Sequence, residues 1–311
     1  MYVLQILWPV VTGLAVLLHT VAFCFLVKSY KGNLKTCQHT YLINLSIVEL
    51  FKNIKFLTVH ILYLVLDYGD LTDEMKVRIH QAAAYLFYIG ATSSTYCYLM
   101  AMYFLTGDRL CAALFLHRYK VVCTIRKSIV LIIVSWFLCY CVNLPVSTVY
   151  YFTHDWRWMR MEGGEMMTRV QLFYIPTVLG IGFVVFGCFT YTVMFVVYAR
   201  SKRNLQRNPE SICTTFVNSN FFISVLLITS FMILMVAPTL VHSYYDIVGK
   251  PMGEAVYTYV YTSWYVSDLV DAIIYVLLYK PVRSLLRANF TSIRTSIVLC
   301  TDRMQRGTSA Q

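Results

Sequence analysis

The chain has 311 residues, of which 59% are hydrophobic and only 13% are charged, and its formal net charge is +11. It is too apolar and too poor in charge for an ordinary soluble domain, so lipid is the expected solvent for much of it. The positive charge alone would suggest nucleic acid as a partner, but its distribution along the chain indicates a membrane instead.

Long apolar segments recur along the whole chain. A bilayer core about 30 Å thick is crossed by roughly 20 apolar helical residues, whereas a β-barrel shows alternating stretches of roughly 10 residues. Because the segments are long and uninterrupted, they predict an all-α membrane protein, a bundle of seven transmembrane helices. The predicted spans are 3–27, 40–66, 79–111, 128–152, 171–199, 216–245 and 254–279.

Basic residues gather in every second connection between these spans. The connections after the first, third and fifth spans and the segment after the seventh are basic, whereas the other connections are mainly acidic. By the positive-inside rule, the basic side faces the cytoplasm. We therefore expect a multi-pass protein of the plasma membrane with an extracellular N-terminus, membrane lipids as partners and no nucleic acid.

The segment after the seventh span predicts a short amphipathic eighth helix on the inner membrane surface. Over 280–291 its apolar residues share one helical face, and Arg283 and Arg287 lie beside it, where they would meet anionic lipid. Connections are short, and no repeat or linker is visible. One receptor-like bundle domain is therefore predicted over 1–291, followed by a short cytoplasmic tail over 292–311.

Several motifs resemble those of the rhodopsin-like, or class A, G-protein-coupled receptors, and they occur in that family's order. The third span ends in Asp108-Arg109, similar to the family's Asp-Arg-Tyr motif. The seventh contains Asp271-Ala-Ile-Ile-Tyr275, similar to Asn-Pro-Ile-Ile-Tyr, and runs into the predicted eighth helix. Further matches are Asn44 to Leu50 in the second span, Trp136 in the fourth, Pro176 in the fifth and Pro238 in the sixth.

The resemblance implies a divergent receptor, and not an enzyme, that transmits binding of an extracellular or membrane-borne small ligand to a heterotrimeric G protein. It assigns Asp108, Arg109 and Tyr275 to G-protein coupling and the activation switch. Arginine suits this role because it stays charged and donates several hydrogen bonds, although a snorkelling arginine at the inner surface would give the same sequence. Since no acidic residue stands near the inner end of the sixth span, we also expect raised basal activity.

Three carboxylic acids, Glu49, Asp268 and Asp271, lie inside predicted spans, where ionisable groups are costly and mark functional sites. The resemblance implies that the positions of Glu49 and Asp271 bind a sodium ion that favours the inactive state. Three carboxylates at one site cannot all stay ionised without a cation, so an ion or proton site holding Na⁺ or protons is predicted. Neutral acids that only stabilise the bundle are the alternative. No cofactor and no other metal are expected.

Two lysines, Lys52 and Lys55, follow Glu49 in the second span. They would attract an anionic ligand if they faced a cavity. Alternatively, Lys52 would pair with Glu49, because residues three apart share a helix face. Both interpretations are open from the sequence.

Aromatic and small polar residues crowd the outer halves of the third and seventh spans, with a histidine on the sixth. This composition is typical of a small-ligand pocket, and also of the aromatic belt at a membrane interface. The seventh span contains no lysine before Lys280, which argues against retinal, so a small molecule, a lipid or a short peptide is the expected ligand. The predicted pocket residues are Tyr88, Thr92, Thr95, Tyr96, His242, Tyr261, Trp264 and Tyr265.

The main alternative function is an ion or solute transporter or channel, because buried acids also mark ion pathways. Such proteins show repeats with helices broken at mid-membrane, and no such symmetry is visible. A membrane enzyme would need clustered metal ligands, but the seven histidines form no ligand motif. A receptor that has lost coupling and serves as a scaffold is disfavoured by the Asp108-Arg109 pair.

Overall fold

The computed structural model describes residues 2–31, 36–69, 71–86, 91–115, 118–142, 175–207, 227–248, 250 and 252–274. Within these ranges the chain is almost entirely helical and contains no strand, so the all-α class is confirmed there. The elements are α1 (Tyr2–Lys31), α2 (Cys37–Tyr68), α3 (Asp73–Tyr85), α4 (Ala91–Leu114), α5 (Tyr119–Val122), α6 (Ile125–Trp136), the π-helical η2 (Phe137–Val142), α10 (Ile175–Arg207), the π-helical η5 (Met232–Val236), α12 (Ala237–Val248) and α13 (Glu254–Ile273).

Two of the described helices are long and apolar enough to cross a membrane. They comprise Leu7–Lys28 in α1, with 22 residues, and Thr177–Val197 in α10, with 21 residues. The 32-residue α2 is longer than either, but it carries Glu49, Lys52 and Lys55, and charged side chains lower the hydropathy of a segment. By length and composition, two described helices are thus able to span a membrane, and the seven-helix bundle stays a prediction.

Large apolar side chains are exposed on the outer faces of several helices. Val178 and Phe195 of α10 are 67% and 69% exposed, and Val10 of α1 is 61% exposed. Water-soluble monomers rarely expose contiguous apolar faces of this kind, whereas such faces suit hydrocarbon. The same feature appears on α6 at Val130, Ile133, Val134 and, in the following η2, at Phe137.

The third predicted span, 79–111, corresponds to two helices, α3 and α4, and residues 87–90 between them lie outside the described part. α3 begins earlier than residue 79, so the helix starts before the predicted span and includes Asp73 and Glu74. Thr72 caps this helix by accepting a hydrogen bond from the backbone nitrogen of Met75 at 3.4 Å. Both acids lie in the first turn, where negative charge favours a helix start.

The sixth predicted span, 216–245, is described from residue 227, as a helical turn followed by η5 and α12. The π-helical turn directly precedes Pro238, whose ring nitrogen donates no hydrogen bond and whose ring crowds the carbonyl four residues earlier. A wider turn relieves that crowding. The predicted eighth helix, 280–291, and the tail, 292–311, lie outside the described residues.

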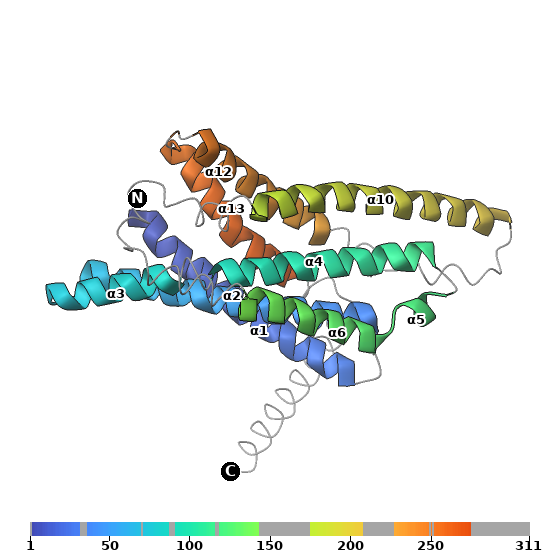
Figure 1. Ribbon diagram of the computed structural model, residues 1–311, viewed down its shortest axis with the longest axis horizontal. Coiled ribbons are helices and arrows are strands. Elements are labelled where there is room, and N and C mark those ends of the chain that lie inside the picture. Colours follow the sequence, from blue (N-terminus) through green and yellow to red (C-terminus); the bar gives the residue numbers. More distant parts are fainter. Residues whose placement is uncertain are drawn as a thin grey trace, which may run out of the picture.

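In this arrangement, α2 packs against α1, α3, α4, α6 and α13, and α4 lies between α10 and α6 (Figure 1). The indole nitrogen of Trp136 donates to the side-chain oxygen of Asn44 at 2.8 Å, which joins α6 to α2. Both residues belong to the motifs that resemble the receptor family. The packing of α1, α4 and α13 around α2 determines which polar side chains meet in the interior.

Candidate functional site

The three predicted acids converge inside the bundle. Glu49 comes from α2, and Asp268 and Asp271 come from α13, one helical turn apart. All three side chains belong to residues that are at most 2% exposed. The expectation that they form one site therefore agrees with the structure.

Lys52 lies between two of these acids. Its ammonium donates to Glu49 Oε1 at 3.1 Å and lies 2.6 Å from Asp268 Oδ1. The same nitrogen lies 4.1 Å from the centroid of the Tyr98 ring, on α4, in a cation–π contact. The predicted Lys52–Glu49 pair is confirmed, and Lys52, only 1% exposed, links α2 to α13.

Asp271 is held by hydroxyl groups. The Tyr98 hydroxyl donates to Asp271 Oδ2, and the Ser230 hydroxyl donates to Oδ1 at 3.2 Å. Tyr98 is fully buried and lies on α4, whereas Ser230 precedes η5. Asp271 thus joins α13 to the third and sixth predicted spans.

Two further polar residues complete the buried cluster, which we define as Glu49, Lys52, Asp268 and Asp271 with their partners. His19 of α1 lies with Nε2 2.9 Å from the backbone oxygen of Asp268 and 3.9 Å from Glu49 Oε2. Asn53 donates to the backbone oxygen of Glu49 at 2.9 Å and to its Oε2 at 3.3 Å. α1, α2, α4, α13 and the helical turn that contains Ser230 therefore contribute to one polar network.

The charge balance of this network determines which of its acids can be ionised. Three acids share one ammonium, so full ionisation would leave two negative charges uncompensated in a dry interior. An unpaired buried charge is strongly destabilising, and such groups instead bind a proton or a counter-ion. The two hydroxyl groups donate to both oxygens of Asp271, which favours its ionised form. Among the described residues, no group of three or more His, Cys, Asp or Glu side chains has the arrangement of a metal site.

The Asp108–Arg109 pair lies near the end of α4 that precedes α5. The Arg109 guanidinium donates to Asp108 Oδ2 through two nitrogens, and its Nε contact is 3.2 Å long. The Tyr119 hydroxyl of α5 donates to the other oxygen of Asp108 at 2.6 Å. Burial and the carboxylate of Asp108 raise the pKa of Tyr119 well above its ordinary value, so this hydroxyl keeps its proton. Tyr275, the third predicted member of the switch, lies outside the described residues.

Four of the eight predicted pocket residues meet in a cluster of rings. His242 of α12 stacks on Trp264 of α13 with centroids 5.8 Å apart, and it meets Tyr261 at 6.2 Å. Tyr261 and Trp264 lie 5.0 Å apart. Tyr265 joins them through Trp8 of α1, whose ring lies 5.5 Å from Tyr265 and 6.1 Å from Tyr261.

Two further pocket residues, Tyr96 and Thr95, lie apart from this cluster. Tyr96 is buried in the hydrophobic core, and Thr95 lines a separate cavity between α4, α10, η5 and α12. Tyr88 and the side chain of Thr92 lie outside the described residues. The predicted pocket is therefore divided, because α4 and α13 present their polar residues to different neighbours.

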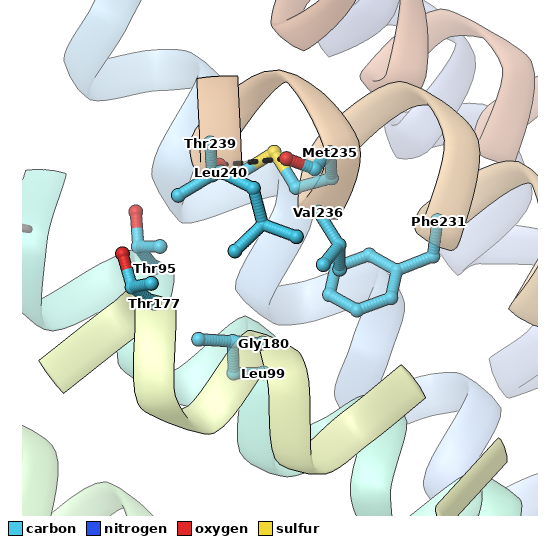
Figure 2. A pocket seen from close by; sticks show the side chains of 9 residues that line it. All are labelled: Thr95, Leu99, Thr177, Gly180, Phe231, Met235, Val236, Thr239 and Leu240. Carbon is cyan, nitrogen blue, oxygen red and sulfur yellow. Dashed lines mark hydrogen bonds between the residues drawn. The ribbon is translucent and has the colours of Figure 1, made fainter. Parts of the chain in front are cut away.

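The cavity beside Thr95 is small and mainly apolar (Figure 2). Its volume is about 20 Å³, which is room for about one water molecule and far below the roughly 300–1,000 Å³ of a ligand pocket. Figure 2 shows the Thr239 hydroxyl of α12 donating to the backbone oxygen of Met235, at 2.6 Å. The lining residues are Thr95, Leu99, Thr177, Gly180, Phe231, Met235, Val236, Thr239 and Leu240.

Sequence reasoning missed several members of these sites. His19, Asn53 and Tyr98 were not proposed for the buried cluster, nor was Tyr119 for the arginine. A polar residue one helical turn from Glu49 would have indicated Asn53, and a histidine in an otherwise apolar span would have indicated His19. No local signal identifies the other two, because each meets its partner only through packing between elements.

A scan against protein-family models finds no match for this chain, and a search of curated proteins finds no significant relative. The motifs and the contacts of the residues within them therefore carry the functional proposal below.

Proposed function

We propose that the protein is a rhodopsin-like G-protein-coupled receptor of the plasma membrane. In this proposal, seven helices span the bilayer with the N-terminus outside, and a small ligand bound from the outer side or from the membrane activates a heterotrimeric G protein. The contact that carries the proposal is the Asp108–Arg109 pair at the inner end of α4, in which Asp108 is buried, Arg109 is partly exposed and Tyr119 of α5 binds the carboxylate.

The pair supports a switch because the partner of Arg109, Asp108, and the hydroxyl that holds Asp108, that of Tyr119, are both local. Asp108 is the neighbouring residue, and Tyr119 belongs to the short α5. A cytoplasmic protein that binds the connection after α4 would move Tyr119 together with the carboxylate of Asp108 that it holds, and so draw this carboxylate away from Arg109. Arg109 would then donate its hydrogen bonds to the bound protein, a role that guanidinium groups suit because they present several donors at once.

In this proposal, the buried cluster transmits the effect of ligand binding from the outer side to this switch. Tyr265 of the ring cluster lies one helical turn before Asp268 on α13, so a ligand that displaces the rings also shifts a residue bound to Lys52. His60 of α2 contacts the Tyr265 ring at 5.3 Å. Movement of α13 relative to α2 must therefore break or rearrange contacts of Lys52.

An ion or solute transporter is the second candidate, and the buried acids favour it. Lys52 weakens this reading, since its ammonium already lies between two of the three carboxyl groups. Transport through the cluster would require this cation to move aside in each cycle. Ionic currents recorded from cells expressing the protein would favour the transporter over the receptor.

The experiment that tests the receptor is a G-protein activation assay without ligand in cells that express the wild type or Arg109→Ala. We expect a basal signal that Arg109→Ala abolishes at equal surface expression. Arg78→Ala is the matched control, because Arg78 is 76% exposed on α3 and pairs only with Glu74 among its ion-pair contacts. An unchanged basal signal in Arg109→Ala, or ionic currents in the wild type, would overturn the proposal.

A further inference from the structure

We infer that Lys52 is the resident cation of the buried cluster, so that its carboxyl groups exclude sodium and other metal ions. This inference concerns the cluster alone and does not depend on coupling to a G protein. In this inference, the cation of the cluster is a side chain of the protein and not an exchangeable ion taken from solution.

The position of the ammonium supports this role. Lys52 Nζ lies 3.1 Å from a Glu49 oxygen and 2.6 Å from an Asp268 oxygen, and these oxygens belong to different helices. The face of the Tyr98 ring covers it at 4.1 Å. Oxygen ligands from two helices and a π face satisfy a monovalent cation, and the four-carbon stem keeps this cation at a fixed high local concentration.

The carboxyl oxygens are also already engaged. Glu49 uses one oxygen for Lys52 and the other for Asn53. Asp271 uses one for Tyr98 and the other for Ser230. One oxygen of Asp268 contacts Lys52. Of the six carboxyl oxygens of the three acids, five therefore have partners within the chain. A metal ion needs several oxygens at once, and here it would have to displace these donors.

Electrostatic repulsion also disfavours a metal ion at this cluster. A metal ion bound to any of these carboxyl groups would lie a few ångströms from the Lys52 ammonium. Two like charges at that separation repel strongly in a poorly screened interior. The cluster therefore accepts protons to balance its remaining negative charge, and removal of Lys52 is what makes room for a metal cation.

The test is thermal unfolding of the purified, detergent-solubilised protein in sodium chloride and in N-methylglucamine chloride at equal ionic strength. We expect the unfolding midpoint of the wild type to be the same in both salts. Lys52→Met keeps a side chain of similar length without the charge, and its midpoint is expected to rise with sodium concentration. Lys55→Met, on the same helix and hydrogen-bonded to Ser94 and Tyr140, is the matched control and should show no sodium dependence.

A wild-type midpoint that rises with sodium would overturn the inference, as would a Lys52→Met midpoint that ignores sodium. If Lys52→Met does not fold, the double variant Lys52→Met/Asp268→Asn removes both charges of the 2.6 Å pair and supplies the measurement. No G protein takes part in this experiment. Its outcome is therefore separate from that of the signalling assay.

Discussion

At the buried cluster, the hydroxyl of Tyr98 connects α4 to α13. Tyr98 donates to a carboxyl oxygen of Asp271, and its ring also packs on Phe231 at 5.1 Å. Removing the oxygen while keeping the ring would leave the packing unchanged. The energetic contribution of this hydrogen bond can therefore be separated from that of the aromatic contact.

We expect Tyr98→Phe to lower the free energy of unfolding by about 1–3 kcal/mol, the range for leaving a buried polar partner unsatisfied. The matched control is Tyr103→Phe on the same helix, whose hydroxyl donates to the backbone oxygen of Leu179 at 2.7 Å. This hydrogen bond is partly exposed and joins two uncharged groups, so it should contribute about 0.5–1.5 kcal/mol to the free energy of unfolding. Chemical denaturation in detergent measures both, and a larger loss in Tyr103→Phe would contradict the prediction.

Sequence identifies the acids of the cluster but not their partners. Glu49, Asp268 and Asp271 stand out because charged groups in apolar spans are costly, and helix geometry offers the Lys52–Glu49 pair as one of two interpretations. The Lys52–Asp268 contact joins residues that are far apart in the chain. The packing of whole helices determines which face of α2 contacts α13, and no local sequence pattern predicts it.

At the scale of the elements, α10 approaches its neighbours through glycines. A Cβ atom at Gly182 would lie 2.9 Å from the Tyr103 hydroxyl, and one at Gly180 would lie 3.2 Å from Val236. The first contact is with the end of a rigid ring that is itself hydrogen-bonded to Leu179. The absence of a side chain at position 182 thus permits the close packing of α10 on α4.

Gly182→Ala is expected to destabilise the protein by about 1–3 kcal/mol, the usual cost of adding atoms to a packed interface. The control is Gly13→Ala on α1, where nothing lies within 4 Å of the added atom. There the better helix propensity of alanine should raise stability by up to about 1 kcal/mol. Unfolding midpoints of the two variants should move in opposite directions, and a shift of the same sign in both would refute this packing argument.

The start of α3 shows why element boundaries differ from the hydropathy pattern. A hydropathy pattern places acidic residues in a connection, yet Thr72 caps a helix that begins with Asp73 and Glu74. Capping and the helix dipole favour such residues at a helix start. The start is therefore set by backbone hydrogen bonds, which the apolar pattern does not report.

On the scale of the whole molecule, the distribution of charge predicts the orientation in the membrane. Among the described helices, α1 and α10 meet the length and hydropathy of a span, and basic residues such as Lys28 and Arg200 lie at their C-terminal ends. Both ends should lie on the cytoplasmic side by the positive-inside rule.

We expect an epitope tag at the N-terminus to be stained by antibody on intact cells. A tag at the C-terminus should be stained only after permeabilisation, because an odd number of spans places the two termini on opposite sides. Flow cytometry of the two tagged proteins, with an intracellular marker as control, makes the measurement. Staining of both tags on intact cells would exclude an odd number of spans.

The four-carbon arm of Lys52 has a consequence for the setting in which such a protein works. A resting state held by dissolved sodium drifts whenever the surrounding fluid becomes saltier or more dilute. A resting state held by a side chain keeps the same balance in any salinity, and only proton concentration is left to adjust it. If Lys52 is the cation of the buried cluster, as inferred above, the residue at position 52 determines whether the charge balance of the cluster depends on the sodium concentration of the environment.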